Sequence, residues 1–141
     1  MATYNKFNAF AVDIGKKVHD LNADTMKIML TNTLPVATNA VKTDITEITA
    51  GNGYTAGGNV VSLPGYAQTA GVGKLSAVAS DPVITASGGS IGPFRYAVLY
   101  NDTATSKNLI AWFDYGSAIT LAIGESLTLD VDQTNGLFTL T

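Results

Sequence analysis

The chain has 141 residues, of which 46% are hydrophobic and 13% charged, and its formal net charge is −3. This length and apolar content fit a single domain over residues 1–141, with a core large enough to need no covalent cross-link. The absence of cysteine excludes disulfides and thiolate chemistry. Because phosphate binding requires clustered cations, the single arginine and the scattered lysines argue against a nucleic-acid partner.

The N-terminal residues lack the uninterrupted apolar run of a signal peptide, so we expect synthesis and folding in a cytoplasm. No apolar run approaches the roughly 18 residues needed to span a bilayer, and no membrane partner is expected. With so few charges, the surface must consist largely of Thr, Ser, Asn, Gly and Ala. Such surfaces are common in protein–protein interfaces, and extracellular β-domains also have them.

The first predicted element is an amphipathic α-helix over about residues 4–21. Gly15 weakens this helix by about 1 kcal/mol relative to alanine. Its apolar side chains recur at helical spacing and form one stripe, which consists of Phe7, Phe10, Ala11, Ile14, Val18 and Leu21.

Short segments follow the helix, separated by turn residues. Residues 35–41 are predicted as a short helical turn, and residues 44–48 as either strand or helix. Residues 50–58 contain four glycines and are predicted as a loop, and residues 66–73 are small and polar. Alternating or β-branched runs indicate strands at Thr25–Thr33, Asn59–Leu63, Lys74–Ser80 and Val83–Ala86.

The two most apolar runs are Phe94–Tyr100 and Leu109–Tyr115, and a polar loop joins them. Their length and their aromatic and β-branched residues predict two strands buried on both faces, paired as a central hairpin. Further alternating runs follow at 119–123, 127–131 and 137–141, the last after the hairpin dipeptide Asn135-Gly136. The sequence therefore predicts a mainly β protein, an antiparallel β-sandwich with one N-terminal helix.

No catalytic, cofactor-binding or metal-binding constellation stands out. His19 is the only histidine, and a solvated or capping residue near the helix end is the preferred interpretation. Asp130 and Asp132 suggest a calcium loop, but the closing glutamate of that motif is missing, so a solvent-facing strand explains them better. The glycines at 71–73 and 51–58 lack the Gly-Lys-Ser/Thr signature of phosphate loops and are interpreted as turns.

Three further features have alternative interpretations. Asn101-Asp102-Thr103 matches the glycosylation acceptor pattern in a predicted loop, which we interpret as incidental. Arg95, the only arginine, lies in an apolar strand, so we expect it to pair with a carboxylate at a sheet edge or subunit contact. We interpret the clustered aromatic residues as core, with a sugar-stacking platform as the alternative; they are Phe94, Tyr96, Tyr100, Trp112, Phe113 and Tyr115.

Several blocks of the chain resemble, in the same order, a family of small structural proteins of tailed-bacteriophage virions. None of these blocks is a mechanistic motif, so the resemblance indicates kinship rather than a catalytic role. The blocks are Tyr4–Phe7, Thr31–Asn39, Asp44–Ile48, Gly51–Gly58, Ser87–Tyr96 and Tyr100–Thr103.

The resemblance implies a head decoration, or cement, protein with a compact β-sandwich, often a jelly roll, on the capsid exterior. Its implied partners are the major capsid protein and other copies of itself, in a trimer or dimer, and no catalytic residue is implied. A tail, baseplate or adsorption component, including one that binds carbohydrate, is the alternative. The loop tyrosines Tyr54 and Tyr66 are the residues expected to test sugar binding.

Overall fold

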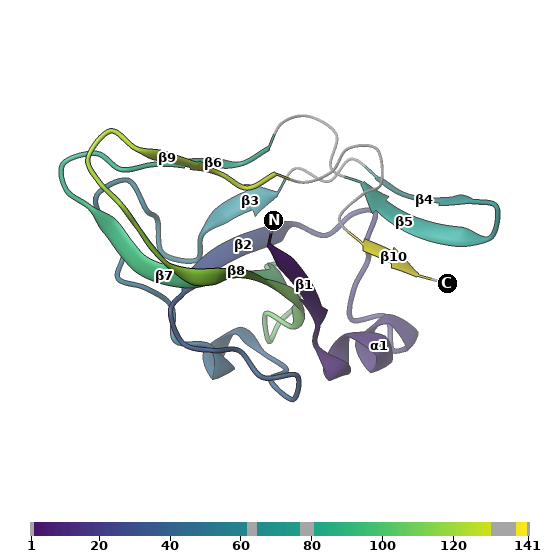
Figure 1. Cartoon of the computed structure of the whole chain (residues 1–141). Coiled ribbons are helices and arrows are strands. Elements are labelled where there is room, and N and C mark those ends of the chain that lie inside the picture. The colour runs from purple at the N-terminus through teal and green to yellow at the C-terminus, as the bar shows by residue number, and fades with distance from the viewer. Residues whose placement is uncertain (1, 62–64, 77–80, 131–137, 141) are drawn as a thin grey trace.

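The computed structural model describes residues 2–61, 65–76, 81–130 and 138–140. In these residues the chain is mainly β, with antiparallel sheets, one α-helix and one short 3₁₀-helix (Figure 1). The helices are α1 (Asn8–Gly15) and η1 (Lys42–Asp44). The strands are β1 (Thr3–Lys6), β2 (Met26–Thr31), β3 (Asn59–Val61), β4 (Gly65–Thr69), β5 (Val72–Ser76), β6 (Val83–Thr85), β7 (Ile91–Asn101), β8 (Leu109–Leu121), β9 (Ser126–Thr128) and β10 (Phe138–Leu140).

The largest sheet has the strand order β1-β8-β7-β2-β3, and every neighbouring pair is antiparallel. Its centre is the hairpin of β7 and β8, which confirms the predicted pairing of the two apolar runs. The N-terminal strands flank this hairpin, with Thr3 opposite Asp114 and Met26 opposite Asn101. The hairpin therefore supplies the pairing edge for both β1 and β2.

Two smaller sheets accompany the main one. Strands β6 and β9 form a ribbon that lies over one face of the main sheet, and its Ile84 side chain is buried there (Figure 1). Strands β10, β5 and β4 form a second small sheet to one side. The main sheet and the covering β6–β9 ribbon give the molecule a sandwich-like core.

Apolar side chains are buried on both faces of the main sheet, as predicted for β7. Ala97 and Leu99 join the larger cluster under β6–β9, whereas Tyr96 and Val98 join a smaller cluster on the opposite face. Phe94 belongs to the larger cluster because the register shifts between Phe94 and Tyr96, which is the signature of a β-bulge.

The predicted helix over residues 4–21 is wrong at both ends. Residues 3–6 form strand β1, because the edge of β8 offers hydrogen-bond partners for an extended chain there. The helix ends at Gly15, which has no side chain to pack, and Lys17 adopts the left-handed conformation with φ of 59°. The apolar stripe is also divided, since Phe7 joins the smaller cluster and Phe10 the larger one.

Smaller differences concern short segments. Residues 35–41 contain a hydrogen-bonded turn and no helix, and residues 66–73 belong to the β4–β5 hairpin. Residues 44–48 are largely irregular after η1. The ends of four predicted strands (59–63, 74–80, 127–131 and 137–141) and the Asn135-Gly136 turn lie outside the described residues. None of the described helices has the length and apolar character needed to cross a membrane.

Candidate protein-binding surface

Among the described residues, an exposed apolar loop is the candidate surface for binding another protein. Residues 32–41 carry no charged side chain. Two large apolar side chains face solvent from this loop, Leu34 with 61% and Val36 with 49% of its surface exposed. Exposed apolar side chains gathered on one short segment favour a protein interface over a purely solvated surface. We refer to residues 32–41 as the apolar loop.

The apolar loop is held by its own backbone and side chains. Pro35 is buried, and a turn is closed by the hydrogen bond from the Asn39 amide to the Val36 carbonyl, at 2.9 Å. Beyond this turn, the Asp44 carboxylate accepts hydrogen bonds from the amides of Ala40 (2.8 Å) and Val41 (3.1 Å). These two bonds lower the pKa of Asp44, so the carboxylate is ionised near neutral pH.

The loop is also attached to the main body at two points. The Asn8 amide at the start of α1 donates to the Ala37 carbonyl at 2.8 Å, and the Leu109 amide of β8 donates to Ala40 at 2.9 Å. Val12, one helical turn beyond Asn8, is also exposed. The loop is thus preformed, and binding through it requires little ordering of the backbone.

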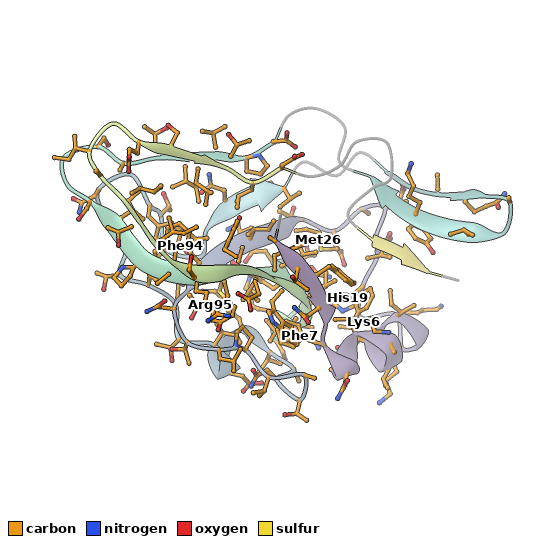
Figure 2. All side chains as sticks on the ribbon, in the orientation of Figure 1. Lys6, Phe7, His19, Met26, Phe94 and Arg95 are labelled. Carbon is orange, nitrogen blue, oxygen red and sulfur yellow. The ribbon has the colours of Figure 1, made fainter. Side chains whose placement is uncertain are left out.

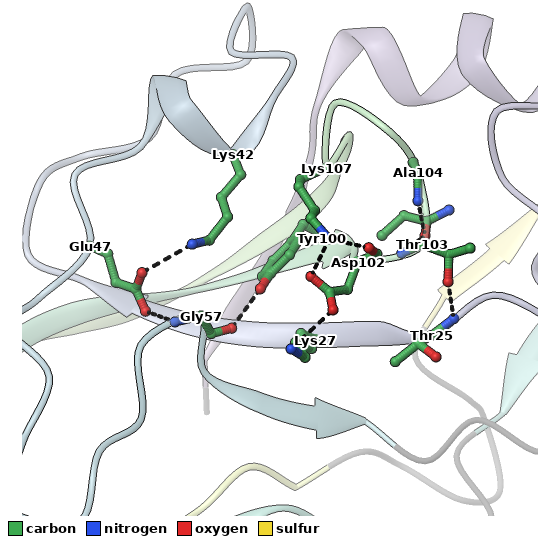
Figure 3. A network of polar contacts seen from close by, with 11 residues as sticks. Thr25, Lys27, Lys42, Glu47, Gly57, Tyr100, Asp102, Thr103, Ala104 and Lys107 are labelled. Atoms are coloured by element: carbon green, nitrogen blue, oxygen red, sulfur yellow. Dashed lines mark hydrogen bonds and ion pairs between the residues drawn. The ribbon is translucent and has the colours of Figure 1, made fainter.

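A polar cluster around Glu47 holds the chain that follows the loop (Figure 3). The Glu47 carboxylate accepts hydrogen bonds from the Tyr54 hydroxyl (2.7 Å) and the Gly57 amide (2.6 Å), and it pairs with Lys42 at 3.3 Å. The Tyr100 hydroxyl donates to the Gly57 carbonyl at 2.7 Å. We call these residues, Lys42, Glu47, Tyr54, Gly57 and Tyr100, the glutamate cluster.

The glutamate cluster changes the interpretation of Tyr54. This tyrosine was expected to be an exposed loop residue that could test sugar binding, but only 2% of it is exposed. Its hydroxyl accepts a hydrogen bond from the Leu30 amide, and burial raises its pKa. The close approach of its loop to β2 requires glycine at position 58, where a Cβ would lie 1.8 Å from the Ile28 carbonyl oxygen. Tyr66, the other tyrosine, is half-buried in β4.

A carboxylate with two lysine partners follows β7. Asp102 forms ion pairs with Lys107 at 2.9 Å and Lys27 at 3.0 Å (Figure 3). The hydrogen bond from Lys107, and then that from Lys27, lower the pKa of Asp102. Lys27 lies on β2, so the pair ties the loop between β7 and β8 to the neighbouring strand.

His19 is buried, which contradicts the predicted solvated or capping position. Only 7% of it is exposed, because the helix ends before residue 19 and the imidazole (Figure 2) packs against the Phe10 ring of α1. Its Nδ1 lies 3.1 Å from the Asn101 Nδ2, and its Nε2 lies 3.9 Å from an Asp13 oxygen. We call Asp13, His19, Asp24, Asn101 and Asn108 the histidine cluster.

Asn101 is the centre of the histidine cluster and not an exposed glycosylation acceptor. It is the last residue of β7 and is fully buried. Its Nδ2 donates to Asp24 at 2.6 Å, and its Oδ1 accepts from the amides of Thr103 (2.9 Å) and Ala104 (3.0 Å). In the folded chain this amide is therefore unavailable to a glycosylating enzyme.

Arg95 pairs with a carboxylate, as predicted, but on two inner strands. Its Nε and Nη2 donate to the two oxygens of Asp114 at 2.8 and 3.0 Å, a bidentate geometry between β7 and β8. The predicted sheet edge is wrong, because these strands are the central pair. The guanidinium is partly exposed and also lies over the Tyr96 ring, with 5.2 Å from Cζ to the ring centroid.

The other candidate residues are structural. The aromatic set is core: Phe94, Tyr96, Tyr100 and Trp112 are buried, while Phe113 and Tyr115 are half-buried and pack against the larger cluster. Gly71 lies in the tight β4–β5 turn, and residues 51–58 form a loop. Asp130 is exposed, and Asp132 lies outside the described residues. The described residues contain no group of three or more side chains suited to hold a metal ion.

Sequence reasoning missed the apolar loop as a surface. The available signal was ten consecutive uncharged residues that include a leucine and two valines, in a stretch interpreted as the end of a strand followed by a helical turn. Comparisons of the chain with protein-family models, curated proteins and solved structures give no match. Function is therefore argued from the geometry of the chain's own surface.

Proposed function

We propose that this chain is a structural protein of a tailed-bacteriophage virion. In this proposal it is a decoration protein without catalytic activity, which binds the outside of the major capsid lattice and stabilises the head. The finer fold proposed for it is a jelly roll. The observation that supports the proposal best is the preformed, uncharged apolar loop, with Leu34 and Val36 exposed on a molecule of low surface charge.

The physical reasoning concerns binding to a repeated lattice. Burying a leucine or valine side chain contributes roughly 1.5–3 kcal/mol, and a rigid loop loses little entropy when it docks. Each contact is therefore modest, but copies joined in an oligomer bind with avidity on a lattice whose sites repeat. A decoration protein needs this combination of an independently stable fold and a small apolar contact.

Self-association is part of the proposal, as a trimer or a dimer. Strand β4 is an outer strand of its small sheet, and its residues Gly65–Thr69 are all uncharged. An uncharged outer strand lacks the lysine or proline that commonly blocks pairing with another chain. Sedimentation velocity of the full chain measures the oligomeric state, and a strictly monomeric species at micromolar concentration would argue against this part.

The first prediction tests the apolar loop directly. Leu34→Ser with Val36→Ser should reduce binding to heads stripped of decoration protein by about 10-fold to 100-fold. The two side chains are only 61% and 49% exposed before docking, so together they lose about half of their full burial energy, roughly 1.4–2.8 kcal/mol. Co-sedimentation with such heads, titrated with the purified chain, measures the affinity.

The matched control for this prediction is Ile123→Ser. Ile123 is more exposed than either loop residue, at 69%, but it lies in the chain between β8 and β9 and outside the apolar loop. The control should bind like the unmodified chain. Equal losses in both variants would show a general effect of surface polarity, and no binding by the unmodified chain would reject head decoration.

Electron cryo-microscopy of the virion distinguishes head from tail. Density for the chain on the capsid exterior is expected, and density confined to the tail or baseplate would replace the proposal with the alternative. A sugar-binding role gains no support from Tyr54, which is buried. Sugar binding is therefore tested on a glycan array with the unmodified chain and with Tyr66→Ala.

A further inference from the structure

The side chain of Asn101 joins two segments that are distant in sequence. One is the connection between α1 and β2, residues 17–24, and the other is the loop after β7, residues 102–106. Towards the connection, Asn101 Nδ2 contacts His19 Nδ1 at 3.1 Å and an Asp24 carboxylate oxygen at 2.6 Å. Towards the loop, Asn101 Oδ1 accepts the amides of Thr103 and Ala104.

These contacts define which imidazole nitrogen carries the proton. Because Asn101 Nδ2 is a donor, His19 Nδ1 must be the acceptor, and the proton of the neutral ring lies on Nε2. That Nε2 is buried and has no hydrogen-bond partner among the described residues. Its nearest carboxylate oxygen, on Asp13, is 3.9 Å away, beyond hydrogen-bond distance.

Protonation of His19 is incompatible with this arrangement. It places a hydrogen on Nδ1, so two donors then face each other across 3.1 Å. Rotating the Asn101 amide by 180° would present its oxygen to the imidazolium. The same rotation would turn the Nδ2 group towards the Thr103 and Ala104 amides, which donate to Oδ1. Neither amide orientation satisfies all of the groups.

We propose that His19 and Asn101 form an acid-sensitive switch. Protonation of His19 breaks its contact with Asn101, releases residues 17–22 from that contact and disturbs the Asn101 amide that accepts the Thr103 and Ala104 amides. The hydrogen bonds of Thr25 to Asp102 and Thr103 keep the loop attached to the start of β2. The main sheet stays folded in this open form, because all members of both core clusters except Leu21 lie outside the 17–24 segment and the 102–106 loop. This inference does not depend on the proposed virion role.

The groups around the imidazole shift the pKa of His19 in opposite directions. Burial against the Phe10 ring, whose centroid lies 5.4 Å from that of His19, disfavours the charged form. Asp13 on α1 and Asp24 before β2 favour it. Burial is the largest effect, and the pKa of His19 is lowered below its usual 6.5. The folded chain therefore holds the neutral ring near pH 7.

The sign of the pH effect follows from this lowered pKa. The contribution of neutral His19 to the closed form is complete above the usual pKa of about 6.5 and decreases as the pH falls below it. The decrease ends at the pKa of the folded form. Asp44, Asp102 and Asp114 have lowered pKa values and remain ionised in this range, so their titration does not obscure that of His19.

Opening would also change the surface of the molecule. A cleft of about 400 Å³ lies between the 17–22 segment and Tyr66, and a second cleft of about 470 Å³ lies between that segment and the 103–106 loop. Lys17 and Asp20 line both clefts, so the segment is the wall between them. Its displacement joins the two clefts and exposes the buried imidazole.

Two measurements on the full chain test the switch. The NMR titration of the single imidazole should give a pKa below 6.5, since no other histidine contributes to the signal. Amide hydrogen exchange should show that the protection of Thr103 and Ala104 falls about tenfold per pH unit below about 6.5, until the folded-state pKa is reached. Protection of β7 amides should change much less.

His19→Asn provides the non-titrating variant, because its Oδ1 can replace Nδ1 as the acceptor for Asn101. Its Thr103 and Ala104 protection should be independent of pH between 7.5 and 5, after correction for the intrinsic exchange rate. Val61→Ala is the control for general destabilisation, with lower protection but an unchanged pH slope. The inference is overturned by an imidazole pKa at or above 6.5, by pH-independent protection in the unmodified chain, or by the same slope in His19→Asn.

Discussion

The glutamate and histidine clusters perform the same structural task with different chemistry. Each attaches a long irregular segment to the β2–β7 region through groups that are shielded from solvent. In the glutamate cluster, an anion receives a tyrosine hydroxyl, a backbone amide and a lysine. In the histidine cluster, the neutral Asn101 amide donates to and accepts from its neighbours, and the imidazole Nε2 has no hydrogen-bond partner within the described part of the chain.

The comparison shows that the response of a buried polar network to acid depends on whether all of its donors and acceptors are paired. A carboxylate surrounded by donors is a satisfied group, and it loses its partners only when it is itself protonated or removed. A buried imidazole titrates within a few pH units of neutrality, and binding a proton turns its acceptor nitrogen into a donor. The histidine cluster is therefore expected to respond to mild acid through His19.

Asn101→Ala should have the largest effect on stability. It leaves the Thr103 and Ala104 amides and the His19 Nδ1 without their partners, at a cost of about 3 kcal/mol in the free energy of unfolding. Urea denaturation at pH 7.5 measures the loss. Asn108→Ala, which removes a single bond to Asp13, should cost about 1 kcal/mol. Equal effects of the two substitutions would contradict the central position of Asn101.

Glu47→Ala should have an intermediate effect, about 2 kcal/mol, because the Tyr54 hydroxyl and the Gly57 amide lose their acceptor. Glu47→Gln is the matched control, since its side-chain oxygen can accept both bonds and only the pairing with Lys42 is lost. Thermal unfolding should therefore rank Glu47→Gln between the unmodified chain and Glu47→Ala. A Gln variant as unstable as the Ala variant would show that the charge of Glu47 matters more than its hydrogen bonds.

Arg95→Met should have the smallest effect. The Arg95–Asp114 pair is bidentate but open to solvent, where ion pairs contribute little. The Arg95–Asp114 pair is also expected to make stability depend on pH in a more acidic range than His19 does. The pKa of Asp114 is lowered, first by Arg95 and then by the Gly116 amide, so its stabilisation is present above about pH 3.8 and decreases as the pH falls further. Arg95→Met should reduce this acid-dependent loss and leave the His19-dependent range unchanged, as measured by urea denaturation from pH 7.5 to 3.

Local patterns were sufficient to predict the central hairpin. The predicted runs 94–100 and 109–115 are apolar, and the loop between them is polar. The strands are longer than predicted, since β7 begins at Ile91 and β8 continues through Gly116 to Leu121, so the separate strand predicted at 119–123 is wrong and most of it is the end of β8. The same reasoning failed for residues 4–21, where Phe7 and Phe10 are spaced as in a helix but point into different clusters. Periodicity reports only the spacing of apolar residues along the chain. Residues 3–6 form a strand because the edge of β8 lies next to them and offers hydrogen-bond partners.

The two polar clusters could not be predicted, because their members meet only in the folded chain. His19 contacts Asn101, which is 82 residues later, and nothing near position 19 indicates burial. Tyr54 lies among glycines that ordinarily mark an exposed loop. Here the glycines allow the backbone to approach β2, so that the Tyr54 hydroxyl reaches the Leu30 amide. Long-range contacts, rather than local propensity, determine both sites.

The position of the β7–β8 hairpin has a consequence for synthesis of the chain on the ribosome. Strands β1 and β2 are made first, but their partners in the sheet are β8 and β7, which are made much later. The nascent N-terminal segment therefore cannot complete its sheet pairing until residues 91–121 have left the exit tunnel. Folding of the main sheet must therefore wait until the hairpin emerges from the ribosome.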